Sequence, residues 1–265
     1  MTSRTARAPG AAARPFVTSR LLDEHGLPHL FTTRHFPGIT RATEPRPPFE
    51  PAAEPLLVAR GLAGEPAYAR QVHGAEVIHA ERGGLAGRAD ALATGRPGLP
   101  LCISTADCLP ILLYDARAGR LAAVHAGWRG TVQSVSRAAV LALRAAGSAP
   151  EDLVAAIGPS IGPCCYEVDS PVIERLAAVF PGGAWEPWVA PKGPGKWMLD
   201  LWRANRDQLA SAGVPAERID LLGLCTGCRP DLLFSYRRER GAGRLVTVAA
   251  LPPGGGPARG PVGGA

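Results

Sequence analysis

Three short apolar runs in the middle of the chain, at residues 99–104, 110–114 and 121–125, most constrain how it can fold. They are partly β-branched and bounded by turn residues, which is typical of buried strands. The last two runs are separated by the polar stretch DARAG, which ends in a glycine suited to a left-handed conformation. The pattern predicts an antiparallel hairpin, which we interpret as the floor of an active site.

The hairpin would bring a thiol and an imidazole together. If it folds about Arg117, Cys108 comes opposite His125 to within a residue or two. Directly opposed side chains have Cβ atoms about 4.5–5.5 Å apart. One metal ion bridges such a gap, since it binds sulfur at about 2.3 Å and nitrogen at about 2.0 Å. A thiolate–imidazolium pair, or a buried cysteine beside a hydrogen-bonded core histidine, fits the same hairpin.

A glycine-rich stretch follows His125, and Thr131 is expected to start an amphipathic helix. Backbone amides at this helix entrance, between Gly127 and Gly130, would form an anion-binding cradle with Arg129 beside them. Alternatively, the glycines serve only a tight turn.

The remaining elements do not alternate regularly. We expect strands near residues 30–34, 76–80, 153–157, 219–224, 232–236 and 245–251, a Pro-rich loop over 37–55, and helices after Asp169 or Ser170 and over 201–213, the latter capped by Asp200. His73 lies at a glycine-marked bend before the second of these strands. Several helices among many strands, without strict βαβ alternation, indicate an α/β mixed (α+β) fold.

The terminal segments, the absence of long apolar runs and the net charge indicate which classes of protein and partner to expect. Residues 1–15 lack the apolar segment of a secretory signal and are expected to form a flexible tail, as is the Pro/Gly-rich segment 252–265, which leaves 16–251 as one domain. No apolar run approaches the length of about 18 residues that spans a bilayer, so we expect a soluble, cytoplasmic protein without membrane contact. The net charge is +6, but the arginines are scattered, so we expect anionic small molecules and no nucleic acid as partners.

The six cysteines are expected to be thiols in a reducing cytoplasm. The segment CTGC, from Cys225 to Cys228, resembles half of a zinc knuckle or a redox pair. The adjacent Cys164 and Cys165 are, however, an awkward second half for one tetrahedral ion. We therefore expect no structural zinc at these four residues.

Five longer motifs are more specific. They are QVHG at 71–74, TADCLP at 105–110, VHAGWRG at 124–130, GPSIG at 158–162 and FSYRR at 234–238. In content and order they resemble the YfiH-type laccase-domain family. The resemblance implies a four-layer arrangement of mixed β-sheets flanked by helices, and a zinc ion held by His73, Cys108 and His125 as catalytic residues. Three protein ligands leave a fourth position open, as in catalytic zinc sites.

The resemblance also implies an activity. Members of the family split adenosine, inosine and S-methyl-5'-thioadenosine with phosphate, as purine nucleoside phosphorylases, and deaminate adenosine. The residues expected to hold phosphate or substrate are Arg129, Gly127, Gly130, Arg34, Arg237 and Arg238. At residues 34–40 the chain departs from the family, which usually has a Gly-Gly-Val-Ser-like turn there. For deamination the proton shuttle would be Asp107 or Glu76, although both also suit structural roles.

Other interpretations stay open. A copper-dependent polyphenol oxidase could use the same ligands, since imidazole and thiolate also suit copper. A metal-free hydrolase, including one that edits peptidoglycan precursors, could use Cys108 as nucleophile and His125 as base. A non-catalytic relative would retain the motifs by ancestry alone. We expect a monomer or a weak homodimer.

Overall fold

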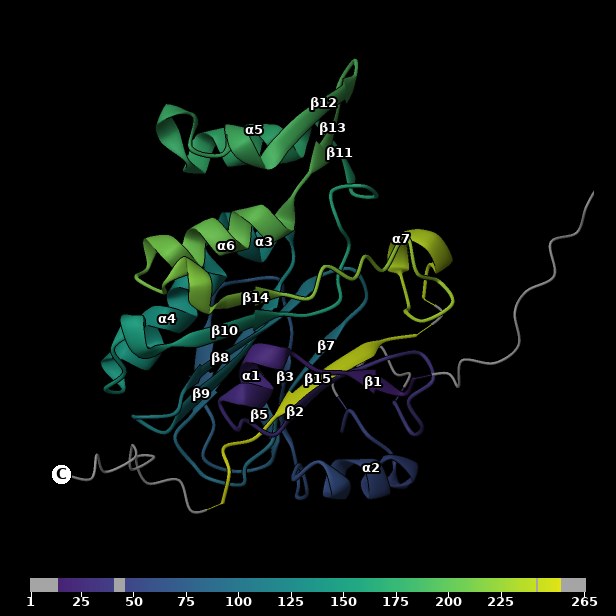
Figure 1. The fold of residues 1–265 in the computed structure, drawn as a ribbon. Coiled ribbons are helices and arrows are strands. Elements are labelled where there is room, and N and C mark those ends of the chain that lie inside the picture. Colours follow the sequence, from purple (N-terminus) through teal and green to yellow (C-terminus); the bar gives the residue numbers. More distant parts are fainter. Residues whose placement is uncertain (1–13, 41–45, 242, 254–265) are drawn as a thin grey trace, which may run out of the picture.

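The computed structural model of the chain describes residues 14–40, 46–241 and 243–253 (Figure 1). The predicted flexible tails therefore lie almost entirely outside the described residues. No helix in these three ranges is both long and apolar enough to cross a membrane.

The strands form two six-stranded sheets and one three-stranded sheet. The first sheet has the order β1 (Phe16–Val17), β2 (His29–Thr32), β15 (Leu245–Ala249), β7 (Leu101–Thr105), β3 (Ala67–Arg70), β5 (Gly84–Arg88). The second has the order β14 (Ile219–Leu221), β10 (Val154–Ile157), β8 (Leu109–Asp115), β9 (Arg120–Ala126), β6 (Ala91–Thr94), β4 (Val77–His79). The third consists of β11 (Glu167–Asp169), β13 (Lys196–Leu199) and β12 (Val189–Gly193).

The helices are α1 (Arg20–Glu24), α2 (Glu54–Ala59), α3 (Trp128–Val132), α4 (Val135–Ala145), α5 (Ser170–Val179), α6 (Leu201–Ser211) and α7 (Tyr236–Glu239). Short 3-10 turns lie at Pro51–Ala53, Pro150–Asp152, Pro181–Gly183, Glu186–Trp188 and Ala216–Arg218.

The two large sheets lie face to face, with α4 and α6 outside the second sheet and α2 outside the first (Figure 1). Strand β8 shows how the sequence builds these layers, because its side chains alternate between its two faces. Ile111 and Leu113 pack outward in one cluster with residues of α4 and α6, whereas Leu112 points inward and packs in the cluster that contains Phe31 of the first sheet. On the far side, Leu30 and residues of α2 form a third cluster. The predicted four-layer arrangement of mixed sheets flanked by helices is confirmed.

Strands β8 and β9 form the predicted hairpin. Pro110 pairs with His125, so Cys108 lies two residues beyond the paired position, within the expected range. At the turn, one carboxylate oxygen of Asp115 accepts two backbone N–H groups at 2.9 and 2.8 Å. Gly119 adopts the expected left-handed conformation, with φ of 61°.

Two expected elements differ from the structure near the glycine-rich stretch and near the C-terminus. The helix expected to start at Thr131 starts at Trp128, after Gly127 as N-cap, and then breaks before α4, because Ser134 has a left-handed φ of 59°. The strand expected at 232–236 is wrong, since Ser235 instead caps α7 with its side chain.

The third sheet and α2 were not predicted. The strands β11 and β12 have few buried residues, so they lack the apolar periodicity that marks a strand. Helix α2 begins directly after the Pro-rich loop, and none of its residues is fully buried.

Replacing Gly158 with alanine should destabilise the fold. A Cβ atom at this position would lie 2.3 Å from the ring of Phe31 and 3.0 Å from Pro110 Cγ. Phe31 is 1% exposed, so its ring cannot move without disturbing the core between the sheets. Overpacking of this kind typically costs about 1–3 kcal/mol, to be measured by denaturant unfolding.

Gly193→Ala is the matched control, because nothing lies within 4 Å of the added Cβ. It should change the free energy of unfolding by less than about 0.5 kcal/mol. Equal stability of the two variants would contradict the packing described for Gly158.

Candidate functional site

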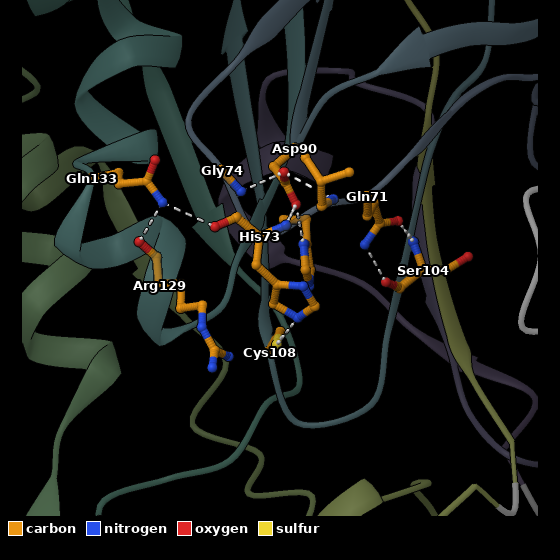
Figure 2. Close-up of polar contacts among 10 residues, drawn as sticks. Gln71, His73, Gly74, Asp90, Ser104, Cys108, Arg129 and Gln133 are labelled. Carbon is orange, nitrogen blue, oxygen red and sulfur yellow. Dashed lines mark hydrogen bonds and ion pairs between the residues drawn. The ribbon is translucent and has the colours of Figure 1, made fainter. Parts of the chain in front are cut away.

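The candidate site lies where the chain crosses from the first sheet to the second. His73 lies between β3 and β4, Asp90 between β5 and β6, and Cys108 between β7 and β8. In each case the earlier strand belongs to the first sheet and the later strand to the second. His125 comes from β9 of the second sheet. The three predicted ligands therefore meet at one end of the two sheets, and Figure 2 shows two of them, His73 and Cys108.

The donor atoms of these residues form a compact group. A ring nitrogen of His73, one of His125 and the sulfur of Cys108 all lie within 4.8 Å of one another. The Cys108 sulfur is 4.0 Å from His73 Nε2, and the two imidazole rings meet edge to face with centroids 4.8 Å apart. Two imidazoles and one thiol suit zinc, and they leave one tetrahedral position to an outside ligand.

Asp90 orients two of the three ligands. Its side chain is fully buried, and one of its oxygens lies 2.7 Å from His125 Nδ1. Burial by itself would raise the pKa of this carboxyl, but the hydrogen bonds from His125 and from backbone amides lower it. An ionised carboxylate only accepts, so His125 Nδ1 carries the proton and Nε2 is directed toward the other ligands.

The same carboxylate holds the bend that carries His73. It accepts the backbone N–H groups of Val72, His73 and Gly74 at 3.1, 2.9 and 2.6 Å. This contact stabilises the left-handed conformation of His73, whose φ is 60° and which is uncommon for a residue with a side chain. Figure 2 shows Asp90 beside the bend, with its contact to Gly74 drawn as a dashed line.

Two glutamines fasten the bend at either side. Gln71 exchanges two hydrogen bonds with the backbone of Ser104 on β7, at 2.7 and 2.9 Å. Gln133, after α3, donates to the backbone oxygens of His73 and Arg129, both at 3.1 Å (Figure 2). The position of His73 is therefore set by contacts to both the first sheet and α3.

Gly127 and Gly130 allow close approach around the ligands. A Cβ atom on Gly127 would lie 2.8 Å from the Cys108 sulfur and 3.0 Å from His73 Cδ2. A Cβ atom on Gly130 would lie 3.0 Å from the backbone oxygen of Gly74. Both glycines thus have a packing role that the sequence analysis did not distinguish from anion binding.

The thiol and the buried imidazole influence each other's protonation. Burial opposes ionisation of Cys108, but the charge and hydrogen bonds of His125 and His73 lower the pKa of this thiol to about 6. Burial likewise opposes the charge on His125, but Cys108 and Asp90 raise its pKa to about 9. In the metal-free protein near neutral pH, Cys108 and His125 are thus a thiolate–imidazolium pair.

The ligands face a cleft of about 630 Å³ whose lining is rich in cations. The arginines that line it are Arg46, Arg70, Arg129, Arg237 and Arg244. Its aromatic residues are Tyr68, Trp128, Tyr166 and Tyr236. Two of the arginines lie over aromatic rings, Arg129 over Trp128 at 4.4 Å and Arg237 over Tyr166 at 5.2 Å. The cleft therefore offers positive charge and flat apolar surfaces beside the three ligands.

The other predicted arginines lie elsewhere. Arg34 follows the end of β2, and its guanidinium contacts both carboxylate oxygens of Glu239 at 2.6 and 2.7 Å and lies over Phe234. Within the described ranges, neither Arg34 nor Arg238 is part of the cleft lining, whereas Arg129 and Arg237 are.

Neither expected proton shuttle is placed well for that task. Asp107 reaches the cleft, but Thr226 donates to one of its oxygens at 2.6 Å and the backbone of Arg237 to the other at 2.7 Å. Glu76 precedes β4 and is absent from the described lining of the cleft.

Asp90 and Tyr166 were not among the predicted site residues. A lone acidic residue directly before a short apolar stretch was the available signal for Asp90. Tyr166 follows the GPSIG loop and lines the cleft, and burial, followed by the charge of Cys108, raises the pKa of its hydroxyl, which therefore stays neutral.

Comparison with known proteins identifies relatives over most of the chain. The family described as multi-copper polyphenol oxidoreductase laccase matches residues 53–252. A purine nucleoside phosphorylase of Deinococcus radiodurans is 40% identical over 238 residues, which cover 85% of this chain and 90% of that protein. The purine nucleoside phosphorylase YlmD of Geobacillus stearothermophilus is 39% identical over 188 residues, which cover 66% of this chain and 68% of that protein.

Solved structures agree with this assignment. The crystal structure of YlmD from Geobacillus stearothermophilus superposes with a TM-score of 0.80 at 30% identity and covers 92% of this chain and 98% of its own. Protein YfiH of Bacillus licheniformis superposes with a TM-score of 0.76 at 29% identity, covering 85% of this chain and 93% of its own. The chain therefore belongs to the multi-copper polyphenol oxidoreductase laccase family, the YfiH-type laccase-domain family that its motifs predicted.

Proposed function

We propose that the protein is a zinc-dependent purine nucleoside phosphorylase that acts on adenosine, inosine and S-methyl-5'-thioadenosine. The observation that carries the proposal is the group of His73, Cys108 and His125 at a cleft lined by five arginines. Relatives about 40% identical to this chain bear the name purine nucleoside phosphorylase, which supports the same reaction.

In this proposal His73, Cys108 and His125 hold the zinc ion. Asp90 keeps His125 in the tautomer that a metal requires, and the bend at residues 72–74 presents His73. A bound zinc ion would supply Lewis acidity in the cleft.

Arg129 and Arg237 would bind phosphate. Both line the cleft, and stacking on Trp128 and Tyr166 limits the freedom of their guanidinium groups, so less side-chain entropy is lost on binding an anion. Arg237 also donates to the backbone oxygen of Glu167 at 2.9 Å, which leaves further N–H groups for a ligand. The first-turn amides of α3, between Gly127 and Gly130, would add to the site. Phosphate held there would attack C1′ of the ribose while the purine leaves.

The purine would lie against the aromatic residues of the cleft. Tyr68, Tyr166 and Tyr236 offer ring faces, and stacking on such faces accepts different purines. A neutral Tyr166 hydroxyl can also donate a hydrogen bond to a ring nitrogen or a sugar oxygen. This arrangement suits several purine nucleosides better than one.

Adenosine deaminase activity is a second part of the proposal. It needs a group that moves protons, and Asp107 is the one carboxylate in the described lining of the cleft. Because both oxygens of Asp107 already accept hydrogen bonds, we propose deamination as the slower reaction. Inosine formed from adenosine in the absence of phosphate would measure it.

Copper oxidation and metal-free hydrolysis are the alternatives. The family description names copper, and two histidines with one cysteine also suit that metal. The Cys108–His125 pair would serve as nucleophile and base only in the absence of a metal. We further propose a cytoplasmic location, where the substrates are found and the free thiols would persist.

Cys108→Ser should lose one metal ion per chain relative to the unaltered protein, because it removes the thiolate ligand. Elemental analysis should identify that ion as zinc. Cys102→Ala is the matched control, since Cys102 is buried and belongs to neither group of candidate ligands. Copper in place of zinc would favour the oxidase, and full activity after chelation would favour the metal-free hydrolase.

Release of purine base should depend on phosphate and yield ribose 1-phosphate. Arg129→Ala removes a charge-assisted contact, typically worth about 1.5–3 kcal/mol, and each 1.4 kcal/mol is about tenfold. The apparent phosphate affinity should therefore fall roughly tenfold to a hundredfold, measured by initial rates over a range of phosphate concentrations, with unchanged metal content.

Arg203→Ala is the control for the loss of a positive charge, since Arg203 is exposed on α6 and pairs with Asp207. It should leave the phosphate dependence unchanged. Equal rates of base release with and without phosphate in the unaltered protein would rule out phosphorolysis and favour hydrolysis.

Metal binding at about pH 7.5 should release a proton from His125. The pKa of about 9 means that this imidazole is charged in the metal-free protein, whereas a ligand must be neutral. Cys108, with a pKa of about 6, has already lost its proton. Metal affinity should thus rise with pH between about 6 and 9.

Zinc titration calorimetry in buffers of different ionisation enthalpy measures the number of protons released. Binding heats that do not vary with the buffer would show that His125 is neutral before the metal binds.

A further inference from the structure

We propose that the protein carries a second metal centre, in which Cys164, Cys165, Cys225 and Cys228 hold a structural zinc ion. Their four sulfur atoms all lie within 4.8 Å of one another. This site is separate from His73, Cys108 and His125, and it does not depend on the proposed function.

The sulfur positions suit a tetrahedral ion better than disulfides. The sulfur of Cys228 lies 3.4 Å from that of Cys164 and 3.5 Å from that of Cys165. Four sulfurs at about 2.3 Å from a zinc ion are about 3.8 Å apart, whereas disulfide sulfurs are about 2.05 Å apart. The Cys228 sulfur therefore lies at nearly the same distance from the sulfurs of Cys164 and Cys165, too far for a disulfide with either and close to the spacing of zinc ligands.

The adjacent Cys164 and Cys165, which we expected to be unsuitable, both reach that centre. They lie in a tight turn, in which the backbone oxygen of Gly162 accepts the N–H groups of Cys165 and Tyr166 at 3.0 and 3.1 Å. The turn directs both sulfurs toward Cys228. Adjacency in the sequence therefore does not keep the two sulfurs from approaching the other cysteines.

The opposite half of the site is a Cys-x-x-Cys turn. The backbone N–H groups of Cys228 and Arg229 donate to the oxygen of Cys225 at 3.2 and 3.1 Å. The amide of Gly162 lies 3.3 Å from the Cys225 sulfur and donates to it, which would stabilise a thiolate. Thus the two halves are linked through one ligand atom even without a metal.

The backbone holds the two halves in register. Ser160 and Cys225 form a parallel β-bridge, and Thr226 donates to the backbone oxygen of Ser160 at 3.0 Å. Gly227 is needed at the contact, because a Cβ atom there would lie 2.8 and 2.9 Å from Cβ and Sγ of Cys165. A side chain at 227 would separate the two halves.

The four cysteines lie in segments that lead to residues of the cleft. Cys165 is followed by Tyr166, and the chain after Cys228 continues to α7, where Tyr236 and Arg237 line the same cleft. Four thiolates fill the coordination sphere of zinc, so the ion has no open position for substrate. Its role would be structural: it joins two loops that both contribute to the cleft.

Zinc analysis of the folded protein and its variants tests the proposal. The unaltered protein should contain two zinc ions per chain. Cys164→Ser and Cys228→Ser, which change exposed residues, should each contain one, and Cys108→Ser should lose the other. Cys102→Ala should keep both. Because the variants address the two sites separately, loss of the proposed zinc ion at the four cysteines can be told apart from loss of the zinc ion at the cleft.

X-ray absorption and thiol alkylation test the same site in protein that keeps all four cysteines. X-ray absorption of the Cys108→Ser protein should give a zinc shell of sulfur only, at about 2.3 Å. The four cysteines should react with an alkylating agent only after chelation. Free reactivity before chelation, nitrogen or oxygen ligands in the shell, or a mass that shows disulfides between these cysteines would overturn the proposal.

Discussion

The buried carboxylate of Asp90 is the interaction on which the rest of the candidate site depends. A buried charge is tolerated only when hydrogen bonds compensate it. Here the compensation comes from three consecutive backbone amides and from the Nδ1–H of His125. The same hydrogen bonds fix the positions of the groups that donate them, namely the backbone of residues 72–74 and the His125 ring. One side chain that is not among the proposed ligands therefore sets the bend that carries His73 and the tautomer of His125.

The second constraint on the site is that the backbone at Gly127 and Gly130 lies directly against Cys108 and the bend that carries His73. Gly127 lies where Cys108 and His73 leave no room for a side chain, and Gly130 lies against the bend at Gly74. These contacts require α3 to begin directly after β9, with no loop between them. The left-handed Ser134 then ends α3 and lets α4 run along the outer face of the second sheet. The short helix and the break after it thus belong to the architecture of the site.

Much of this arrangement could be predicted from local patterns in the sequence. The β8–β9 hairpin was predictable because its register follows from a short turn, and this register brings Cys108 and His125 to one end. The cap at Asp200 was predictable for the same reason, since its side chain accepts the backbone N–H of Arg203 only three residues on.

Two of the missed features depend on contacts between distant parts of the chain. Asp90 is 35 residues from His125, and no periodic pattern links the two. The four cysteines come together through tertiary contacts, among them the bridge between Ser160 and Cys225 and the hydrogen bond from Gly162 to the Cys225 sulfur. Segment 232–236 is a different case, because its residues are strand-like but the local hydrogen bond from the backbone N–H of Arg238 to Ser235 caps α7 there instead. Propensity could not determine which of these contacts would form.

The three connections that run from the first sheet to the second affect how substitutions in the core would alter the candidate site. His73, Asp90 and Cys108 lie on three connections that leave the first sheet and enter the second, while His125 is built into the second sheet itself. The register of β8 and β9 sets the separation of Cys108 from His125, whereas Gln71 ties the bend that carries His73 to Ser104 of the first sheet. The distance of His73 from the other two donors therefore depends on how the two sheets pack around Phe31 and Leu112. A side chain of another size in that layer would move one candidate ligand relative to the other two without touching the site.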